Sequence, residues 1–530
     1  MLCNYRLACL LLALPIVLCL SGCRGNSVSR ESGPPEYRNI VVITVDTLRA
    51  DRLGAYGYDK AKTPNIDALA ARGVLFTNAT TPLPRTTPAV ASLLTGLWPK
   101  NHGSRDVGTP VRSVSRLPQI LAARGFATLG VASTRALSAQ MEMHRGFDEY
   151  VVRNYQAENI THYALTLVDQ QPEDKPIFLW VHYFDPHFQY DPPSTWVDQP
   201  AADKCRALQR AMRSSAPPIT LGQLQSDFRQ MASRAVVDCA ELYDAEIAYT
   251  DYYTGVLLDG LRKRSRLDNA LVIFNADHGE SFGEQSVYFE HGTNVHDSSL
   301  RVPLIIAGDG IEPRRDTGTV ALEDLMPTVL SLLRVPPGQR PQSDGSDISS
   351  RLVGGVTDSS AASPLRFAES GSTFHWDATH SIFAGHKNGP RCIHDRRFSL
   401  CGHETIEKRL VDRPKDPRCL FDVSDEYPEE KKRLMAIWDA WLVEEKRELT
   451  VRNERFKLTR FPLLNGGYRS ELYDLKDTDG ADRNVIDAHP EIASELTRAL
   501  DEWAQDRTQS DEREIRSPEE LETLRALGYL

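Results

Sequence analysis

The stretch Asn39-Ile-Val-Val-Ile-Thr-Val-Asp46 decides the fold. Between its polar ends the residues are apolar or β-branched without interruption, which is typical of a strand buried on both faces. Such strands occupy the middle of parallel sheets that helices cover on both sides. Because the stretch ends on Asp46, we expect the central strand to bring a carboxylate to the edge of the sheet.

Strands and helices are predicted to alternate along the chain. Apolar runs predict strands at 128–133, 176–181, 270–275 and 302–307, and helical patterns are found at 65–72, 117–124 and 246–264. Alternation of this kind predicts an α/β fold. We therefore expect a mostly parallel mixed sheet sandwiched by helices, with a smaller C-terminal α+β domain.

The 530 residues are too many for one compact core and predict two domains. The first, at 38–355, carries the sheet and contains a polar, helix-prone insertion at 194–238. The second, at 356–530, is the α+β domain. Within it, 393–400 resembles 451–458, and each predicts a unit of two strands and a helix, with chance similarity as the alternative.

The N-terminus has the pattern of an export signal. An apolar run at 7–20 is too short for an ordinary transmembrane helix, and it ends in Leu20-Ser-Gly-Cys23, which resembles a bacterial lipoprotein cleavage box. That resemblance implies a signal peptide at 1–23, a lipidated Cys23, a tether at 24–37 and attachment of the exported protein to the membrane of the cell envelope. A plain secretory signal or an anchor is the alternative.

Charge and cysteine content limit the partners. The net charge of −11 argues against a nucleic-acid binder. Export permits disulfides, and plausible pairs are Cys205 with Cys239, and Cys392 with either Cys401 or Cys419.

Polar residues follow several of the predicted strands. Asp46, His187 and the pair Asp277-His278 all come at or shortly after strand ends. Ligands of open α/β sheets bind beyond the carboxyl ends of the strands, so we expect these side chains to share one pocket. His182, which lies close to the end of its strand, is assigned a structural role.

A further stretch, Thr86-Thr-Pro88 followed by an apolar run to Gly96, predicts a helix with proline at its first position and a threonine hydroxyl at its N-terminus. A helix N-terminus attracts anions. The alternative is an ordinary capped helix.

These residues predict a metal site with a nucleophile. Asp46, Asp277 and His278 favour zinc, manganese or iron over calcium, and Thr86 could complete the set as a metal-bound nucleophile. His187 and His291 are candidates for a second metal, for protonation of a leaving group or for contacts to substrate oxygens.

An ordered series of motifs resembles the sulfatase family of the alkaline phosphatase superfamily over roughly 38–530. The motifs include Val45-Asp-Thr-Leu-Arg-Ala-Asp-Arg-Leu-Gly54, Leu93-Leu-Thr-Gly96, Asp185-Pro-His187, Ala276-Asp-His-Gly-Glu280 and Leu524-Arg-Ala-Leu-Gly-Tyr529. The resemblance implies a hydrolase that needs a divalent metal (zinc, manganese or calcium, as one or two ions) and acts on an anionic ester of a small molecule, glycan or lipid.

The chain departs from the family at the nucleophile. Sulfatases carry Cys or Ser there, converted to formylglycine, whereas the motif register puts Thr86 at this position, with Ala89 and Val90 in place of the usual Ser and Arg. Thr47 replaces the usual second metal aspartate. A threonine nucleophile with Asp277-His278 resembles the phosphodiesterase branch of the superfamily instead.

The sequence therefore predicts hydrolysis of sulfuric or phosphoric esters through Thr86. The alternatives are a phosphodiesterase or phosphonate monoester hydrolase, a transferase of envelope head groups, and a non-catalytic binding lipoprotein.

Overall fold

The computed structural model describes residues 37–505 apart from short gaps, which fall at 155, 198, 215–220, 285–287, 354–363, 372–373, 377–380, 385–390, 395–397, 404–405, 413–421, 442–446, 464–466 and 478–482. The predicted signal peptide, Cys23, Cys419 and the motif at 524–529 lie outside the described residues. Among the helices that are described, none is both long and apolar enough to cross a membrane.

A nine-stranded sheet forms the centre of the fold, in the order β10-β2-β9-β6-β1-β5-β3-β4, with β11 also paired to β2. Strand β9 is antiparallel to β2 and β6, and the other pairings described in this sheet are parallel. The strands are β1 Asn39–Val45, β2 Gly73–Thr80, β3 Ala127–Ala132, β4 Glu149–Val152, β5 Ile177–Tyr183, β6 Ala270–Ala276, β9 Arg301–Gly308, β10 Arg314–Asp316 and β11 Val320–Ala321.

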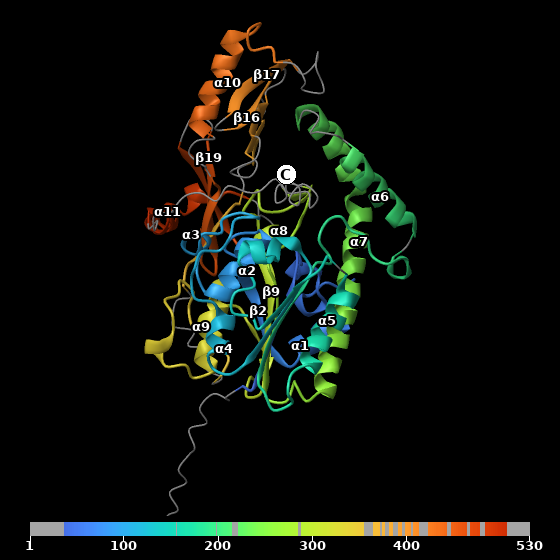
Figure 1. Cartoon of the computed structure of the whole chain (residues 1–530). Helices are drawn as coiled ribbons and strands as arrows, with labels where there is room; N and C mark the ends of the chain where they lie inside the picture. The colour runs from blue at the N-terminus through green and yellow to red at the C-terminus, as the bar shows by residue number, and fades with distance from the viewer. Residues whose placement is uncertain are drawn as a thin grey trace, which may run out of the picture. The chain divides into compact units, whose positions relative to one another are not determined.

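Helices cover both faces of this sheet (Figure 1). On one face α1 (Pro64–Ala70) and α5 (Ala157–Asp169) pack against α7 (Leu221–Lys263). On the other, α4 (Leu117–Ala122) and α9 (Leu325–Leu332) pack against α2 (Thr86–Thr95). The predicted α/β fold with a mostly parallel mixed sheet is confirmed.

Strand β1 lies between β5 and β6, and every residue of β1 is buried. Its apolar side chains therefore face helices on both sides, as the uninterrupted pattern predicts. The register pairs Val45 with Ala276 of β6 and with Tyr183 of β5. The residues that follow β1 and β6, Asp46 and Asp277, consequently lie next to each other at one edge of the sheet.

The C-terminal part is built from antiparallel strands, as expected for the α+β region. One sheet has the order β12-β18-β19-β20, and Leu458, Leu472, Leu496 and Leu500 contribute to a core between this sheet and α11. A second sheet has the order β13-β14-β15-β16-β17. The bounds are β12 Arg366–Glu369, β13 Phe374–Trp376, β14 Ser381–Ala384, β15 Arg391–His394, β16 Phe398–His403, β17 Ile406–Asp412, α10 Pro428–Trp441, β18 Leu449–Arg452, β19 Phe456–Pro462, β20 Tyr468–Asp474 and α11 Pro490–Gln505.

The two resembling segments occupy equivalent places. The first supplies the antiparallel pair β15 and β16, and the second supplies the pair β18 and β19. Each pair continues into a third antiparallel strand, β17 or β20, and then into a helix, α10 or α11. The prediction of two strands and a helix per unit was therefore one strand short.

The insertion contains α6 (Gln199–Ser214), which packs against α7. A disulfide joins Cys205 to Cys239, and both residues are buried. The predicted pairing of these two cysteines is confirmed. The register of β15 and β16 sets Cys392 opposite Cys401.

We expect replacement of Cys205 and Cys239 by alanine to destabilise the protein, because the crosslink closes a loop with a sequence separation of 34 residues. The loss in unfolding free energy should be about 2–4 kcal/mol, measured by urea unfolding. Wild-type protein under reductant should lose at least as much stability. Equal stability of the two proteins would contradict this prediction.

Candidate active site

Two aspartates lie side by side where β1 and β6 end. Asp46 and Asp277 have no exposed surface. The backbone N–H groups of Thr47 and His278 donate to Asp277 Oδ1, over 3.2 and 2.8 Å, and so fix the orientation of this carboxylate. Its other oxygen, Oδ2, turns toward the space it shares with Asp46.

The loop after Asp46 has a constrained backbone. Thr47 has a φ of 52°, which is uncommon for a β-branched residue. The hydroxyl of Tyr243, on α7, donates to the Thr47 carbonyl over 2.7 Å and accepts from the Arg49 N–H over 2.9 Å. Helix α7 therefore holds the turn that aims the Thr47 N–H at Asp277.

His278 presents one ring nitrogen to both carboxylates. Its Nδ1 lies 3.0 Å from the carbonyl oxygen of Gly279, which can only accept, so Nδ1 carries the proton. The lone pair of Nε2 then points into the site. It lies 3.7 Å from Asp46 Oδ1 and 3.6 Å from Asp277 Oδ2.

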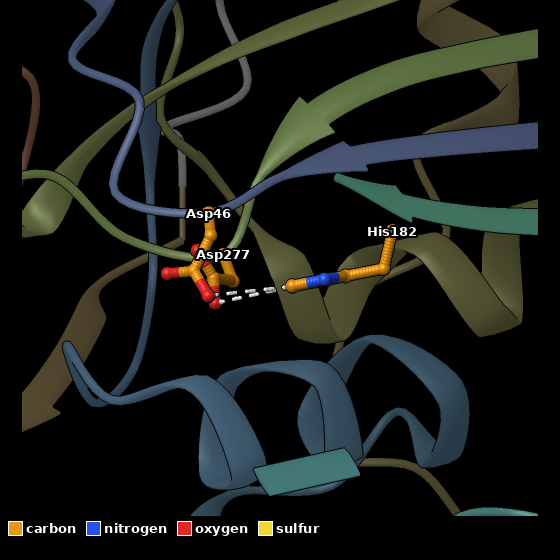
Figure 2. A group of neighbouring side chains, drawn as sticks. All are labelled: Asp46, His182 and Asp277. Carbon is orange, nitrogen blue, oxygen red and sulfur yellow. Dashed lines mark ion pairs between the residues drawn. The ribbon is translucent and has the colours of Figure 1, made fainter. Parts of the chain in front are cut away.

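His182 reaches the same carboxylates from β5. Figure 2 shows its imidazole pointing at Asp46 and Asp277, and Nε2 lies 3.8 Å from an oxygen of each. His182 was predicted to have a structural role, whereas it lies beside both carboxylates of this site. The available signal was a histidine directly after the apolar strand predicted at 176–181.

The donor set fits a divalent cation. Among the described residues, several buried polar atoms here have no hydrogen-bond partner, namely Asp46 Oδ1 and Oδ2, Asp277 Oδ2, His182 Nε2 and Thr47 Oγ1. Unpaired buried polar atoms are costly, and carboxylate and imidazole donors together suit zinc or manganese. The predicted ligands Asp46, Asp277 and His278 thus converge on one centre.

Electrostatics point the same way. Burial, followed by the charges of Asp277 and Glu280, raises the pKa of Asp46 well above its usual range. For Asp277 burial acts in the same direction, but His278 and His182 outweigh it and lower the pKa to about 2. The centre therefore carries a strong negative potential that a cation would neutralise.

Thr86 is the first residue of α2 and is fully buried. Its Oγ1 lies 3.5 Å from His278 Nε2. The neighbouring hydroxyl of Thr87 turns away and donates to the Ala136 carbonyl over 2.6 Å. Only Thr86 of this pair therefore faces the acidic centre.

The start of α2 differs from the prediction. The helix begins two residues before Pro88, with Arg85 as the N-cap and no side-chain capping bond. Proline is accommodated there because backbone N–H groups in the first turn have no helical partner. As a result the Thr86 hydroxyl is not used as a cap.

The two remaining predicted histidines lie beside this centre. The ring centroid of His291 is 4.3 Å from that of His278 and 5.0 Å from that of His187. Burial and then the His291 ring lower the pKa of His187, and burial, His278 and Arg85 lower that of His291, in both cases well below the usual range. Both imidazoles are therefore neutral near pH 7.

Two charged residues of the site, Arg85 and Glu280, were not among the predicted site residues. Arg85 directly precedes Thr86, is 6% exposed and pairs with Asp106 over 3.5 Å. A Cβ on Gly292 would come within 2.3 Å of Arg85 Nε, so position 292 requires glycine. Glu280 lies 3.3 Å from His291 Nδ1, and burial raises its pKa to about 8.

A buried acidic and histidine centre at the carboxyl edge of a parallel sheet, with a hydroxyl beside it, defines an α/β enzyme. The sulfatase family model matches residues 38–335, more than half of the chain. The protein belongs to the sulfatase family and is a hydrolase acting on ester bonds. This family is metal-dependent, and the buried group Asp46, His182 and Asp277 could bind a metal.

Known relatives agree with this membership. The chain is 26% identical to an ulvan-active sulfatase of Formosa agariphila over 64% of this chain and 70% of that protein. Its fold is similar to a phosphonate monoester hydrolase of Silicibacter pomeroyi, at 18% identity and a TM-score of 0.59, covering 89% of this chain and 96% of that one. It is also similar to a protein solved with its substrate D-glucosamine-2-N,6-O-disulfate, at 17% identity and a TM-score of 0.56, covering 91% and 100%.

We expect stabilisation by metal to grow with pH. The raised pKa of Asp46 means that metal-free protein has its full stability at low pH and loses stability as pH rises and this carboxyl ionises. A bound cation removes that penalty, so Zn²⁺ or Mn²⁺ should raise the Tm of EDTA-treated protein more at pH 8 than at pH 5.

The variant Asp277→Asn should lose this metal effect. Asp185→Asn is the matched control, because Asp185 is a buried aspartate whose pKa is raised to about 6 by burial, but it belongs outside the acidic centre. A pH-independent effect, or one that survives in Asp277→Asn, would show that the centre does not bind the metal.

Proposed function

We propose that the protein hydrolyses an anionic ester of sulfuric, phosphoric or phosphonic acid by nucleophilic attack of Thr86. The observation that carries the proposal is the 3.5 Å contact between Thr86 Oγ1 and His278 Nε2, at a centre that also contains Asp46 and Asp277. A hydroxyl is a weak nucleophile unless a base or a metal lowers its pKa.

The proposed ligands are Asp46, Asp277, His278 and the Thr86 oxygen. A divalent cation bound there would lower the pKa of the Thr86 hydroxyl and polarise an ester oxygen. Its proposed identity is zinc, manganese or calcium. The imidazole and carboxylate donors favour the first two.

Helix α2 holds the Thr86 hydroxyl in a position suited to attack. All residues of α2 are buried, so the helix holds its first hydroxyl in a fixed place. The substrate group would lie at the N-terminal end of α2, where the helix dipole stabilises negative charge on its oxygens. Arg85 adds positive charge at the same end.

His187 and His291 are proposed to bind the ester oxygens and the leaving group. Each is neutral before substrate binds, so each ring carries a single N–H. The Nδ1 of His187 contacts the Phe188 carbonyl, which can only accept, so the ring proton lies on Nδ1 and Nε2 would accept from a protonated oxygen of the ester or leaving group. Glu280 and His291 can share a proton through their 3.3 Å contact, which would support proton transfer to a leaving oxygen.

Thr86 favours phosphorus over sulfur as the centre attacked. A formylglycine hydrate can release sulfate through its second hydroxyl, whereas a threonine ester has no such group. Its covalent intermediate must be cleaved by water at sulfur or phosphorus, and metal-assisted attack of this kind is familiar in phosphoryl transfer. We therefore rank phosphonate monoesters and phosphodiesters above sulfates.

Export and attachment through Cys23 remain part of the proposal. The Cys205–Cys239 disulfide supports export, since disulfides persist mainly in oxidising compartments. An enzyme so placed would meet anionic esters of glycans, lipids or small molecules outside the cytoplasm.

The test is a panel of aryl sulfate, phosphate monoester, phosphodiester and phosphonate monoester substrates, with metal analysis of the same sample. We expect Thr86→Ala to lower kcat/KM for the best substrate by at least about 10³-fold. Thr86→Ser retains a hydroxyl and should keep measurable turnover, and the matched control Thr87→Ala should keep most of it. Unchanged turnover in Thr86→Ala would refute the proposal.

A further inference from the structure

We infer that the imidazole of His182 is a further ligand of the cation in the acidic centre, and that Ser133 fixes the tautomer in which it can bind. This inference rests on the proposed function in one respect: both place a metal ion in the acidic centre. It is carried by the hydrogen bonds on the far side of the His182 ring.

Ser133 immediately follows β3, and the register of β3 and β5 pairs Ala132 with His182. The Ser133 hydroxyl lies 2.8 Å from the backbone carbonyl oxygen of His182 and 3.3 Å from its Nδ1. A carbonyl oxygen can only accept, so it takes the single hydroxyl proton of Ser133. The Ser133 oxygen is then left as an acceptor, and Nδ1 must carry the ring proton.

In this neutral tautomer Nε2 has a lone pair. It points at Asp46 Oδ2 and Asp277 Oδ2, each 3.8 Å away, and these oxygens are acceptors as well once both carboxyls are ionised. All three atoms are buried and lack hydrogen-bond partners in the described part of the chain. A metal ion can bind several lone pairs that point at one place where no hydrogen-bond donor is present.

The same arrangement recurs at His278, where the Gly279 carbonyl fixes the proton on Nδ1. The cation would therefore have imidazole ligands on two sides, one from β5 and one from the loop after β6. An inner partner that orients a metal-binding histidine, as Ser133 does here, is a usual feature of metal sites.

A different state of His182 would give different results. As an imidazolium, it would form ion pairs with Asp46 and Asp277 and could not bind a metal. X-ray absorption at the zinc edge separates the two, because imidazole ligands have a distinct scattering pattern. With one equivalent of Zn²⁺, our inference predicts that wild-type protein has both His182 and His278 as imidazole ligands, and a single imidazole would overturn it.

Variants provide a second test. His182→Asn should lose one imidazole from the zinc spectrum and bind Zn²⁺ at least ~10–100-fold more weakly, and Ser133→Ala should weaken binding by a similar factor with the imidazole count unchanged. Ser133→Thr retains the hydroxyl and should restore affinity. The matched control is His102→Asn. His102 is fully buried, lies 3.0 Å from the Ser92 hydroxyl and is not part of the acidic centre, so this variant should bind Zn²⁺ as the wild type does.

An unchanged imidazole count and affinity in His182→Asn would overturn the inference. If His182→Asn does not fold, the wild-type count still decides the question. The readout is independent of turnover, so loss of the Thr86 proposal would leave it intact, and a failure here would leave Thr86 untouched.

Discussion

The site depends on the burial of two carboxylates at the ends of adjacent parallel strands. Asp46 and Asp277 follow β1 and β6, whose register sets them side by side without solvent. Such a pair is unfavourable unless positive charge compensates it. The neighbouring elements surround the two carboxylates with imidazoles and position a hydroxyl beside them.

Several separate elements meet these demands. Helix α7 holds the turn at Thr47 through Tyr243, β5 contributes His182, and α2 brings Thr86 to His278. The C-terminal sheet also contacts this edge, because Lys457 of β19 donates to Asp297 and to the Val295 carbonyl. A substitution in any of these elements can therefore alter the site without touching the reacting atoms.

The fold and the site could be predicted from the sequence wherever a local pattern of residues has one usual structural meaning. An uninterrupted apolar run predicts a buried strand, and polar residues at strand ends predict a shared pocket, so the sheet and the group Asp46, Asp277 and His278 could be anticipated. His182 could not, because its role depends on which strand pairs with β1, and pairing between distant strands is not encoded locally. Arg85 and the exact start of α2 depend likewise on packing around Gly292 and Pro88.

The central claim is that Thr86 becomes covalently modified during turnover. Rapid acid quench of the metal-loaded enzyme with excess substrate, followed by peptide mass spectrometry, tests it most directly. Our account predicts a phosphoryl, phosphonyl or sulfuryl group on Thr86, absent from the Thr86→Ala variant. An adduct on Thr87, or an unmodified peptide during measurable turnover, would contradict it.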